Sequence, residues 1–237
     1  MRKSFFRFKK FACSHGAGSM KIGVDAVLIG AWADVSGARR IIDVGTGCGV
    51  IALMCAQRNP ASDILAIDVD DSSVVEAREN FLMSPWSGRL EARREDFNHI
   101  SLKDVDLIIS NPPYFNSGIS SPDTPRLMAR HQSDLSPHVL LTKGKDMLSE
   151  RGRISMIIPA ERMEEVLDTA HSSCLHMVRA LYVKGHPKAP VKRILMEFGY
   201  SEEEIVIEDI PVMVLETADG QPTPGHHQLC KDFYLKF

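Results

Sequence analysis

Paired cysteines are missing from this chain. Its 237 residues contain five cysteines, an odd number, and no two of them are spaced as Cys-x-x-Cys. We therefore expect neither a zinc site nor a disulfide framework, and no other bound metal. A reducing cytoplasm fits this use of cysteine best.

Long apolar runs are missing too. No stretch reaches the roughly 20 apolar residues that a membrane-spanning helix needs, so we expect no association with a membrane. We expect no secretion signal either, because Arg7, Lys9 and Lys10 interrupt any apolar region near the start. The net charge of −3 excludes a polycation, so binding to nucleic acid would depend on local basic patches.

What the chain does have is a regular alternation of strand and helix patterns. Strands are expected over residues 40–44, 63–69, 90–94, 105–110 and 152–158, and helices over residues 22–33, 47–58, 72–81, 135–148 and 160–174. This alternation predicts βαβ units and a parallel sheet. Residues 176–184 and 192–200 have the pattern of two more strands, and the short loop between them predicts an antiparallel hairpin at the sheet edge.

A glycine-rich turn follows the first expected strand. Gly45, Gly47 and Gly49 let the backbone approach a ligand closely, and the helix that follows offers free N–H groups. By itself this G-x-G-x-G turn is compatible with several nucleotides. It lacks both the G-x-G-x-x-G spacing and the lysine of a phosphate loop. Asp43, just before the glycines, suits a ligand with a positively charged amine better than a pyrophosphate.

Acidic residues also follow the next two expected strands. Asp68 lies 19 residues after Gly49, where a carboxylate can accept both hydroxyls of a ribose. Asp70 competes for that role, but we favour it as the N-cap of the following helix. Asp96 could accept from an adenine amino group while Phe97 covers the ring. A polar turn with one core aromatic residue is an equally open alternative.

Asn111, Pro112, Pro113 and Tyr114 follow the strand expected over residues 105–110. The two prolines fix φ and carry no N–H, and a residue before a proline is held extended. The loop can therefore present the side-chain oxygen of Asn111, the carbonyl oxygen of Pro112 and the ring of Tyr114. Two acceptors are what a planar –NH2 group requires, and an aromatic ring can stack on a flat base or amide. A plain turn that ends a strand is the alternative.

The order of these motifs resembles the S-adenosylmethionine-dependent methyltransferase superfamily over about residues 20–200. The resemblance implies a Rossmann-like class I methyltransferase fold: α/β, with a mostly parallel seven-stranded sheet, an antiparallel edge hairpin and helices on both faces. It also implies S-adenosyl-L-methionine as the cofactor, whose amino-acid end, ribose and adenine match the three kinds of acceptor. In that superfamily an Asn-Pro-Pro-Tyr motif marks transfer to a planar nitrogen, and Asn111, Pro112 and Tyr114 are then the catalytic residues.

Three further segments narrow the resemblance to one family within this superfamily. They are residues 5–11, 20–32 and 231–237, and they resemble the bacterial family that methylates N6 of the adenine beside the anticodon of a valine tRNA. This resemblance implies that Lys21, Gly23 and Asp25 lie over the amino-acid end of the cofactor. Val24 stands where many relatives are expected to have threonine, so we predict no hydroxyl contact to the cofactor there.

Basic residues near the start and around the expected hairpin could contact RNA. The candidates are Arg7, Lys9, Lys10, Arg130, Lys188, Lys192 and Arg193. Together they could contact the RNA, although for any single one of them a solvated surface residue is the favoured interpretation. An anticodon loop offers single-stranded bases that can be splayed out and stacked, so tRNA is the expected partner.

These interpretations combine into one expected organisation. Residues 1–237 form a single methyltransferase domain, with a basic arm over residues 1–21, the cofactor-binding and catalytic core over residues 22–175, and the edge hairpin and tail over residues 176–237. We expect a cytoplasmic monomer. Three alternatives stay open: a protein glutamine-N5 methyltransferase, an rRNA guanine-N2 methyltransferase, and an RNA-binding module that keeps the fold without activity.

Overall fold

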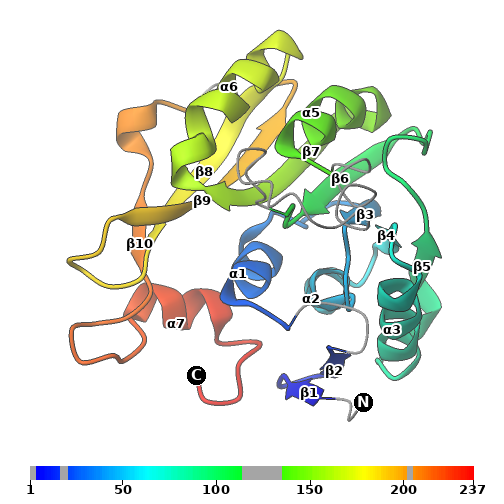
Figure 1. The fold of residues 1–237 in the computed structure, drawn as a ribbon, viewed down its shortest axis with the longest axis horizontal. Coiled ribbons are helices and arrows are strands. Elements are labelled where there is room, and N and C mark those ends of the chain that lie inside the picture. Colours follow the sequence, from blue (N-terminus) through cyan, green and yellow to red (C-terminus); the bar gives the residue numbers. More distant parts are fainter. Residues whose placement is uncertain (1–3, 17–20, 114–134, 202–204) are drawn as a thin grey trace, which may run out of the picture.

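One mixed sheet forms the centre of the computed structural model, which describes residues 4–16, 21–113, 135–201 and 205–237 (Figure 1). Among these residues the sheet has eight strands in the order β10-β8-β9-β7-β6-β3-β4-β5. The strands are β3 (Arg40–Val44), β4 (Asp63–Asp68), β5 (Leu90–Arg94), β6 (Val105–Ser110), β7 (Leu148–Pro159), β8 (His176–Lys184), β9 (Val191–Gly199) and β10 (Val212–Val214). Only β9 runs antiparallel to its neighbours, which confirms the expected α/β fold with a mostly parallel sheet.

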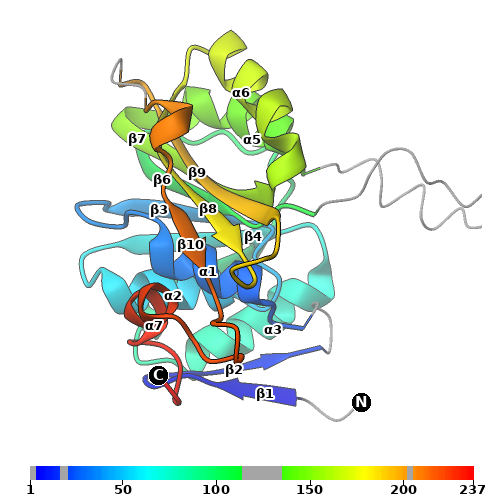
Figure 2. The same cartoon turned by 90° about the vertical axis from the view of Figure 1, so that its left-hand side faces the viewer.

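Helices cover both faces of this sheet (Figure 2). On one face lie α1 (Val24–Trp32), α2 (Val50–Arg58), α3 (Asp71–Leu82) and α7 (Pro224–Cys230), and on the other lie α5 (Pro137–Gly144) and α6 (Met163–Ser172). The central strands are buried on both faces, which explains their nearly continuous apolar sequences. Each face of the sheet therefore has its own hydrophobic core.

A third layer covers α1 and α2 on the side away from the sheet. It consists of a hairpin of β1 (Ser4–Arg7) and β2 (Ala12–His15), together with α7 and the residues after it (Figures 1 and 2). Phe8 and Phe11 of the hairpin are only 4% and 7% exposed. Because they are covered on two sides, α1 and α2 can be apolar around most of their circumference.

The structure differs from the sequence-based expectation at several element ends. The edge hairpin of β8 and β9 exists, but the three-residue strand β10 pairs with β8 and forms the actual edge. Helix α2 begins at Val50 rather than at Gly47, because the glycines of the turn have positive φ values that a helix cannot contain. Helix α5 ends at Gly144, and a 3-10 turn then leads directly into β7.

Candidate active site

Four of the predicted site residues come together at one edge of the sheet. Asp43, Asp68, Asp96 and Asn111 lie at or just after the carboxyl ends of β3, β4, β5 and β6. These strands are parallel neighbours, so their carboxyl ends lie along the same edge. In open α/β sheets this edge is where ligands bind. The convergence predicted from the spacing of the motifs is therefore present.

Asp43 is fully buried and holds the glycine-rich turn against α2. Its Oδ2 accepts hydrogen bonds from Thr46 Oγ1 at 2.6 Å and from the Ala52 N–H at 3.1 Å. Its Oδ1 is buried without a hydrogen-bond partner among the described residues. Burial raises the pKa of Asp43 to about 7, and the nearby Asp68 carboxylate adds to this effect, while the two hydrogen bonds oppose it. A buried carboxylate with an unused oxygen suits a cationic ligand nearby.

The glycines of the turn are required by its backbone and by packing within the protein. Gly45, Gly47 and Gly49 have φ values of +70°, +54° and +82°. A Cβ on Gly49 would lie 2.5 Å from the Phe81 ring, and one on Gly45 would lie 2.7 Å from the Leu135 side chain. The sequence interpretation assigned all three glycines to close approach of a ligand. For two of them the structure shows that a side chain of the protein makes the close approach.

Asp68, at the end of the neighbouring strand β4, also forms a hydrogen bond with the glycine-rich turn. Its Oδ2 accepts from the Gly47 N–H at 2.9 Å and its Oδ1 from the Asp70 N–H at 3.0 Å. Burial raises the pKa of Asp68. Each carboxylate oxygen keeps a lone pair with which it can accept a further hydroxyl. Asp70 is the N-cap of α3, since its side chain accepts from the Ser73 N–H, as the sequence favoured.

Asp96 and Phe97 lie in different surroundings although they are adjacent. Asp96 Oδ1 accepts from the N–H and the side-chain amide of Asn98, at 2.9 and 3.0 Å. Phe97 is 3% exposed and belongs to the core between the sheet, α5 and α6. This placement matches the alternative of a polar turn with one core aromatic residue, and Asp96 keeps free acceptor capacity toward the strand ends.

The loop after β6 begins inside the described part of the chain. Ser110, the last residue of β6, donates from Oγ to the Val44 carbonyl at 2.8 Å and joins the ends of β6 and β3. Asn111 is half-buried and Pro112 is buried, whereas Pro113 is exposed. Asn111 and Pro112 thus follow directly from a strand end that is fixed to the strand carrying Asp43. Two further predicted residues, Tyr114 and Arg130, lie outside the described residues.

The first turn of α1 forms an ion pair that the sequence did not suggest. Asp25, in the first turn of α1, accepts from Arg193 Nε of β9 at 2.8 Å. The sequence assigned Asp25 to the cofactor and Arg193 to RNA, but the structure joins them directly. Gly23 is the N-cap residue of α1, and Lys21 is exposed.

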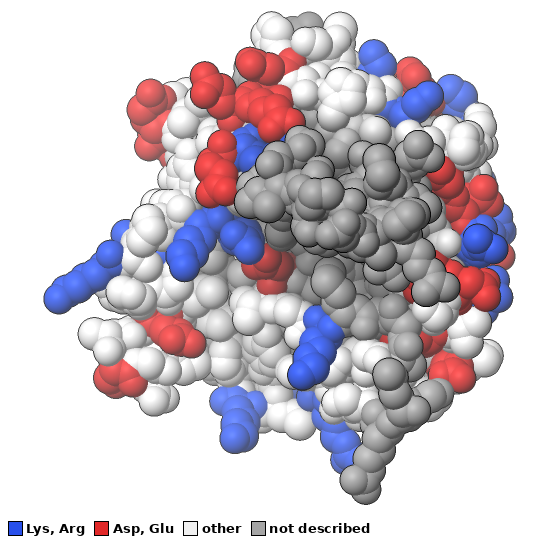
Figure 3. Space-filling view, in the orientation of Figure 1, with Lys and Arg blue, Asp and Glu red and all other residues white. Residues whose placement is uncertain are grey.

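The other predicted RNA-binding residues divide into two groups. Arg7, Lys10, Lys188 and Lys192 are exposed, as phosphate contacts would need to be. Lys9 is exposed as well, but its Nζ already donates to the main-chain oxygens of Lys231 at 2.6 Å and Phe237 at 2.8 Å. Lys9 therefore fastens the two ends of the chain together. Figure 3 shows Lys and Arg side chains across the lower half of the face that carries the strand ends.

Asn80 of α3 is a residue whose importance the sequence interpretation missed. It is fully buried, and its side chain accepts from the Ser14 N–H at 2.8 Å. Its amide group donates to the carbonyl oxygens of Ser14 and Cys48, at 2.9 and 2.8 Å. Asn80 thus connects the amino-terminal hairpin to the glycine-rich turn. The available signal was a polar residue between Ala77 and Phe81 on the apolar face of a predicted helix.

Neither a metal cluster nor a membrane helix is found in the part of the chain that the structure describes. No group of three or more His, Cys, Asp or Glu side chains in residues 4–16, 21–113, 135–201 and 205–237 could hold a metal ion. Over the same ranges, every helix is too short or too polar to cross a bilayer.

Known proteins resemble this chain along its whole length. The Methyltransferase small domain family matches residues 25–179. A tRNA1(Val) (adenine(37)-N6)-methyltransferase from Bacteroides thetaiotaomicron is 38% identical over 237 residues, covering 99% of both chains. Enzymes with the same name from Trichodesmium erythraeum and Vibrio vulnificus are 40% and 36% identical and cover 98% of this chain and 98% and 95% of their own. The chain belongs to the tRNA1(Val) (adenine(37)-N6)-methyltransferase family.

Solved structures share the fold of this chain. A predicted O-methyltransferase from Agrobacterium tumefaciens superposes with a TM-score of 0.67 at 18% identity, covering 88% of this chain and 96% of that one. TYW2 from P. horikoshii, solved in complex with MeSAdo, gives 0.58 at 13% identity, covering 84% and 72%. At such identities the similarity concerns the fold, which is that of class I methyltransferases.

Proposed function

We propose that this methyltransferase transfers a methyl group from S-adenosyl-L-methionine to the exocyclic N6 of an adenine in tRNA, the adenine 3′ of the anticodon in a valine tRNA. One observation carries the proposal: Asn111 and Pro112 lie at the end of β6, next to the strand that carries Asp43, in a chain 38% identical over its full length to enzymes named for this reaction. The glutamine and guanine alternatives are not favoured by any of those relatives.

The residues at the strand ends fit the three parts of the cofactor. Asp43 brings a carboxylate oxygen without a partner among the described residues, which suits the positively charged amino-acid end. Asp68 is held by main-chain N–H groups with lone pairs left for two ribose hydroxyls. Asp96 Oδ2 lies 3.4 Å from His99 Nδ1 and keeps a lone pair for the amino group of adenine. The family resemblance implies that Gly23 and Asp25 lie over the cofactor's amino-acid end, and in the structure Asp25 pairs with Arg193 of β9.

Bound S-adenosyl-L-methionine supplies a methyl group that is already activated by the positive sulfur. The task of the protein is then to orient a poor nucleophile, because the lone pair of the adenine N6 is delocalised into the ring. The side-chain oxygen of Asn111 and the carbonyl oxygen of Pro112 would accept the two N–H bonds. Two fixed acceptors favour the nitrogen as it becomes pyramidal and positive, and they align it with the methyl group. The proton can leave after transfer, so no strong base is required. Tyr114 would stack on the flipped adenine.

Four of the predicted RNA-binding residues are exposed. Arg7, Lys10, Lys188 and Lys192 are available for phosphates, while Lys9 and Arg193 already have partners within the protein. We propose that the enzyme works in the cytoplasm as a monomer. Its five cysteines are all free, which fits a reducing compartment.

The decisive experiment identifies the methylated nucleoside. The protein is incubated with cofactor carrying a labelled methyl group and bulk tRNA, and the RNA is digested to nucleosides. Label in N6-methyladenosine is the expected result, and tRNA from a strain lacking the protein should have lost that nucleoside. Label in protein would support glutamine methylation and label in N2-methylguanosine the guanine alternative. If calorimetry detects no cofactor binding, the protein is a non-catalytic RNA-binding module.

A further inference from the structure

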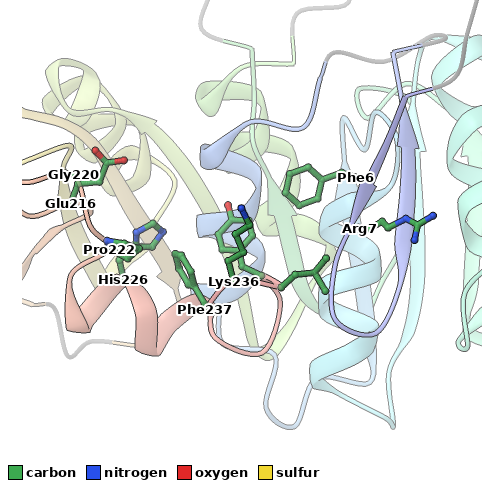
Figure 4. Close-up of a pocket in the computed structure, with 10 residues that line it drawn as sticks. Phe6, Arg7, Glu216, Gly220, Pro222, His226, Lys236 and Phe237 are labelled. Atoms are coloured by element: carbon green, nitrogen blue, oxygen red, sulfur yellow. The ribbon is translucent and has the colours of Figure 1, made fainter.

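The two ends of the chain enclose a cavity that the proposed reaction does not use. It has a volume of about 410 Å³ and is lined by residues of β1, of α7 and of the chain after β10 (Figure 4). We call it the terminal pocket; the residues that define it for the argument are Phe6, Glu216, His226, Tyr234, Lys236 and Phe237. None of the residues lining it comes from the ends of β3, β4, β5 or β6. Two of the elements that line it, β1 and α7, lie below α1 in Figure 1.

The walls of the terminal pocket are held by specific contacts between the chain ends. Lys9 Nζ donates to the main-chain oxygens of Lys231 and Phe237, and the Lys9 N–H donates to the Phe233 carbonyl at 2.8 Å. Phe8 forms an antiparallel bridge with Tyr234. The cavity is therefore bounded by two segments that are bonded to each other.

Aromatic rings form most of these walls. The Tyr234 ring lies 4.9 Å from Phe237 and 6.1 Å from Phe6, measured between centroids. His226 stands at 87° to the Phe237 ring, with 5.0 Å between centroids. Figure 4 shows His226 and Phe237 on one side of the cavity and Phe6 on the other. Rings on both sides offer faces and edges to a flat aromatic ligand.

His226 adds a hydrogen-bond acceptor to this aromatic site. It is only 9% exposed, and its Nδ1 lies 3.1 Å from the Leu215 carbonyl oxygen. A carbonyl only accepts, so Nδ1 carries the proton. Burial lowers the pKa of His226, so the ring is neutral at pH 7 and Nε2 has a lone pair. Nε2 is buried without a partner among the described residues, and a donor N–H would satisfy it.

The charges around the terminal pocket match those of a nucleotide. Lys236 and Arg7 are exposed, and Figure 4 shows Arg7 directed away from the cavity, toward the outer side of β1. Such cations at the rim can meet the phosphates on either side of a bound base. The Glu216 carboxylate is exposed at the opposite wall and offers acceptors only. A base with N–H donors on one edge complements this set.

We propose that the terminal pocket binds a second nucleobase of the RNA substrate, one that presents an amino or imino N–H, at a distance from the adenine that is methylated. This inference rests on the proposed function, because it assumes that the substrate is RNA. Stacking on rings and rim contacts to phosphates are the two means by which proteins hold single-stranded nucleotides. The terminal pocket would contribute to selection of the tRNA and not to the chemical step.

The test compares tRNA affinity with catalysis. Phe237→Leu keeps an apolar side chain but removes the aromatic face, and His226→Phe keeps a buried ring but removes the acceptor. Each change should weaken binding of fluorescently labelled tRNA about five- to tenfold. The turnover number at saturating tRNA and the affinity for S-adenosylhomocysteine should stay as in the wild type. Leu82→Ala is the control, since Leu82 is 77% exposed on α3 outside the terminal pocket.

A cross-link gives a second measurement that does not depend on a variant folding well. The wild-type protein is irradiated with tRNA containing 4-thiouridine, and the cross-linked peptides are identified. Cross-links to residues 234–237 are expected. Unchanged tRNA affinity in both variants together with no cross-link there would overturn the proposal. The two ideas fail separately: a wild type that forms no N6-methyladenosine contradicts the proposed function, whereas methylation with unaltered tRNA affinity in both variants and no cross-link contradicts only the terminal pocket.

Discussion

The strand-end site and the terminal pocket are built in opposite ways. At the strand end, each candidate residue lies at or just after the carboxyl end of its own strand, and the parallel order of β3, β4, β5 and β6 brings the residues together. In the terminal pocket, residues more than 200 positions apart share one cavity, held by contacts such as that of Lys9 with Phe237. A site made from local motifs can be recognised along the sequence. A site made from distant segments becomes visible only after folding.

One residue connects these two regions. Asn80 bonds to Ser14 of the amino-terminal hairpin and to Cys48 of the glycine-rich turn. The hairpin that forms one wall of the terminal pocket is thereby fixed to the loop that Asp43 and Asp68 hold in place. The regions differ in construction, but a displacement of the hairpin would also disturb the glycine-rich turn.

The largest effect is expected at the centre of the strand-end site. Asn111→Ala should lower the turnover number about a thousandfold, because one of two fixed acceptors for the reacting amino group is lost. Cofactor binding should be nearly unchanged. Single-turnover methylation of tRNA and calorimetry with S-adenosylhomocysteine measure the two quantities. Equal losses in both would contradict the assignment of Asn111 to the chemical step.

A substitution in the glycine-rich turn should have the next largest effect, which is on the stability of the protein. Gly49→Ala places a Cβ 2.5 Å from Phe81 at a φ of +82°. The free energy of unfolding should fall by about 3 kcal/mol, from strain at positive φ and from overpacking. Urea denaturation measures this change. Gly88→Ala, where a Cβ meets nothing within 4 Å, is the control and should stay within about 0.5 kcal/mol of the wild type.

Asp43 should give the strand-end site a dependence on pH. Burial raises the pKa of its carboxyl from 3.8 to about 7. The folded protein thus holds this proton more tightly than the unfolded chain does. Protonation of Asp43 therefore stabilises the folded state below pH 4, and this stabilisation is lost as the pH rises to about 7. Above about pH 7 the charged carboxylate should favour a cationic ligand.

The affinity for S-adenosyl-L-methionine should therefore rise as the pH increases through about 7. The total rise should be about tenfold for each pH unit by which the bound ligand lowers the pKa of Asp43. Asp43→Asn should remove this rise and the accompanying fall in stability. Calorimetry from pH 5.5 to 8.5 with both proteins provides the measurement. The same pH profile in wild type and variant would assign the titration to another group.

The smallest effect is expected where the chain ends meet. Lys9→Ala removes two hydrogen bonds to main-chain oxygens at an exposed position, so the free energy of unfolding should fall by about 1 kcal/mol. Lys10→Ala is the matched control, because Lys10 is the next residue and is exposed. Thermal denaturation of both variants measures the difference in stability. If Lys9→Ala instead weakened tRNA binding without loss of stability, Lys9 would be an RNA contact and not a fastening between the chain ends.

Most elements of the sheet could be predicted from the sequence, because each strand and helix carries its own periodic pattern. The strands over residues 40–44, 90–94 and 105–110 were predicted with their observed ends. The hairpin of β1 and β2, the strand β10 and the helix α7 were not predicted. These elements are short, and their apolar residues are spaced irregularly because they pack on helices rather than forming a face of their own.

Some residues of the candidate site could likewise be predicted from the sequence, and others could not. Asp43, Asp68, Asp96 and Asn111 could be placed from their position after strands, since the end of a parallel strand has a known location in this type of sheet. The pairing of Asp25 with Arg193 could not be predicted, because α1 and β9 meet only in the folded chain. The burial of Phe97 depends likewise on which face of the sheet α5 and α6 cover.

The sequence by itself determined the fold class, the cofactor motifs and the acceptor loop at Asn111. Each of these follows from interactions between residues near one another in the chain, where spacing alone fixes geometry. Only the tertiary structure decided that Lys9 fastens the chain ends, that Asn80 joins the hairpin to the glycine-rich turn and that aromatic residues of both ends surround a cavity. These contacts depend on the packing of distant segments around α1 and α2, and such packing leaves no regular spacing in the sequence.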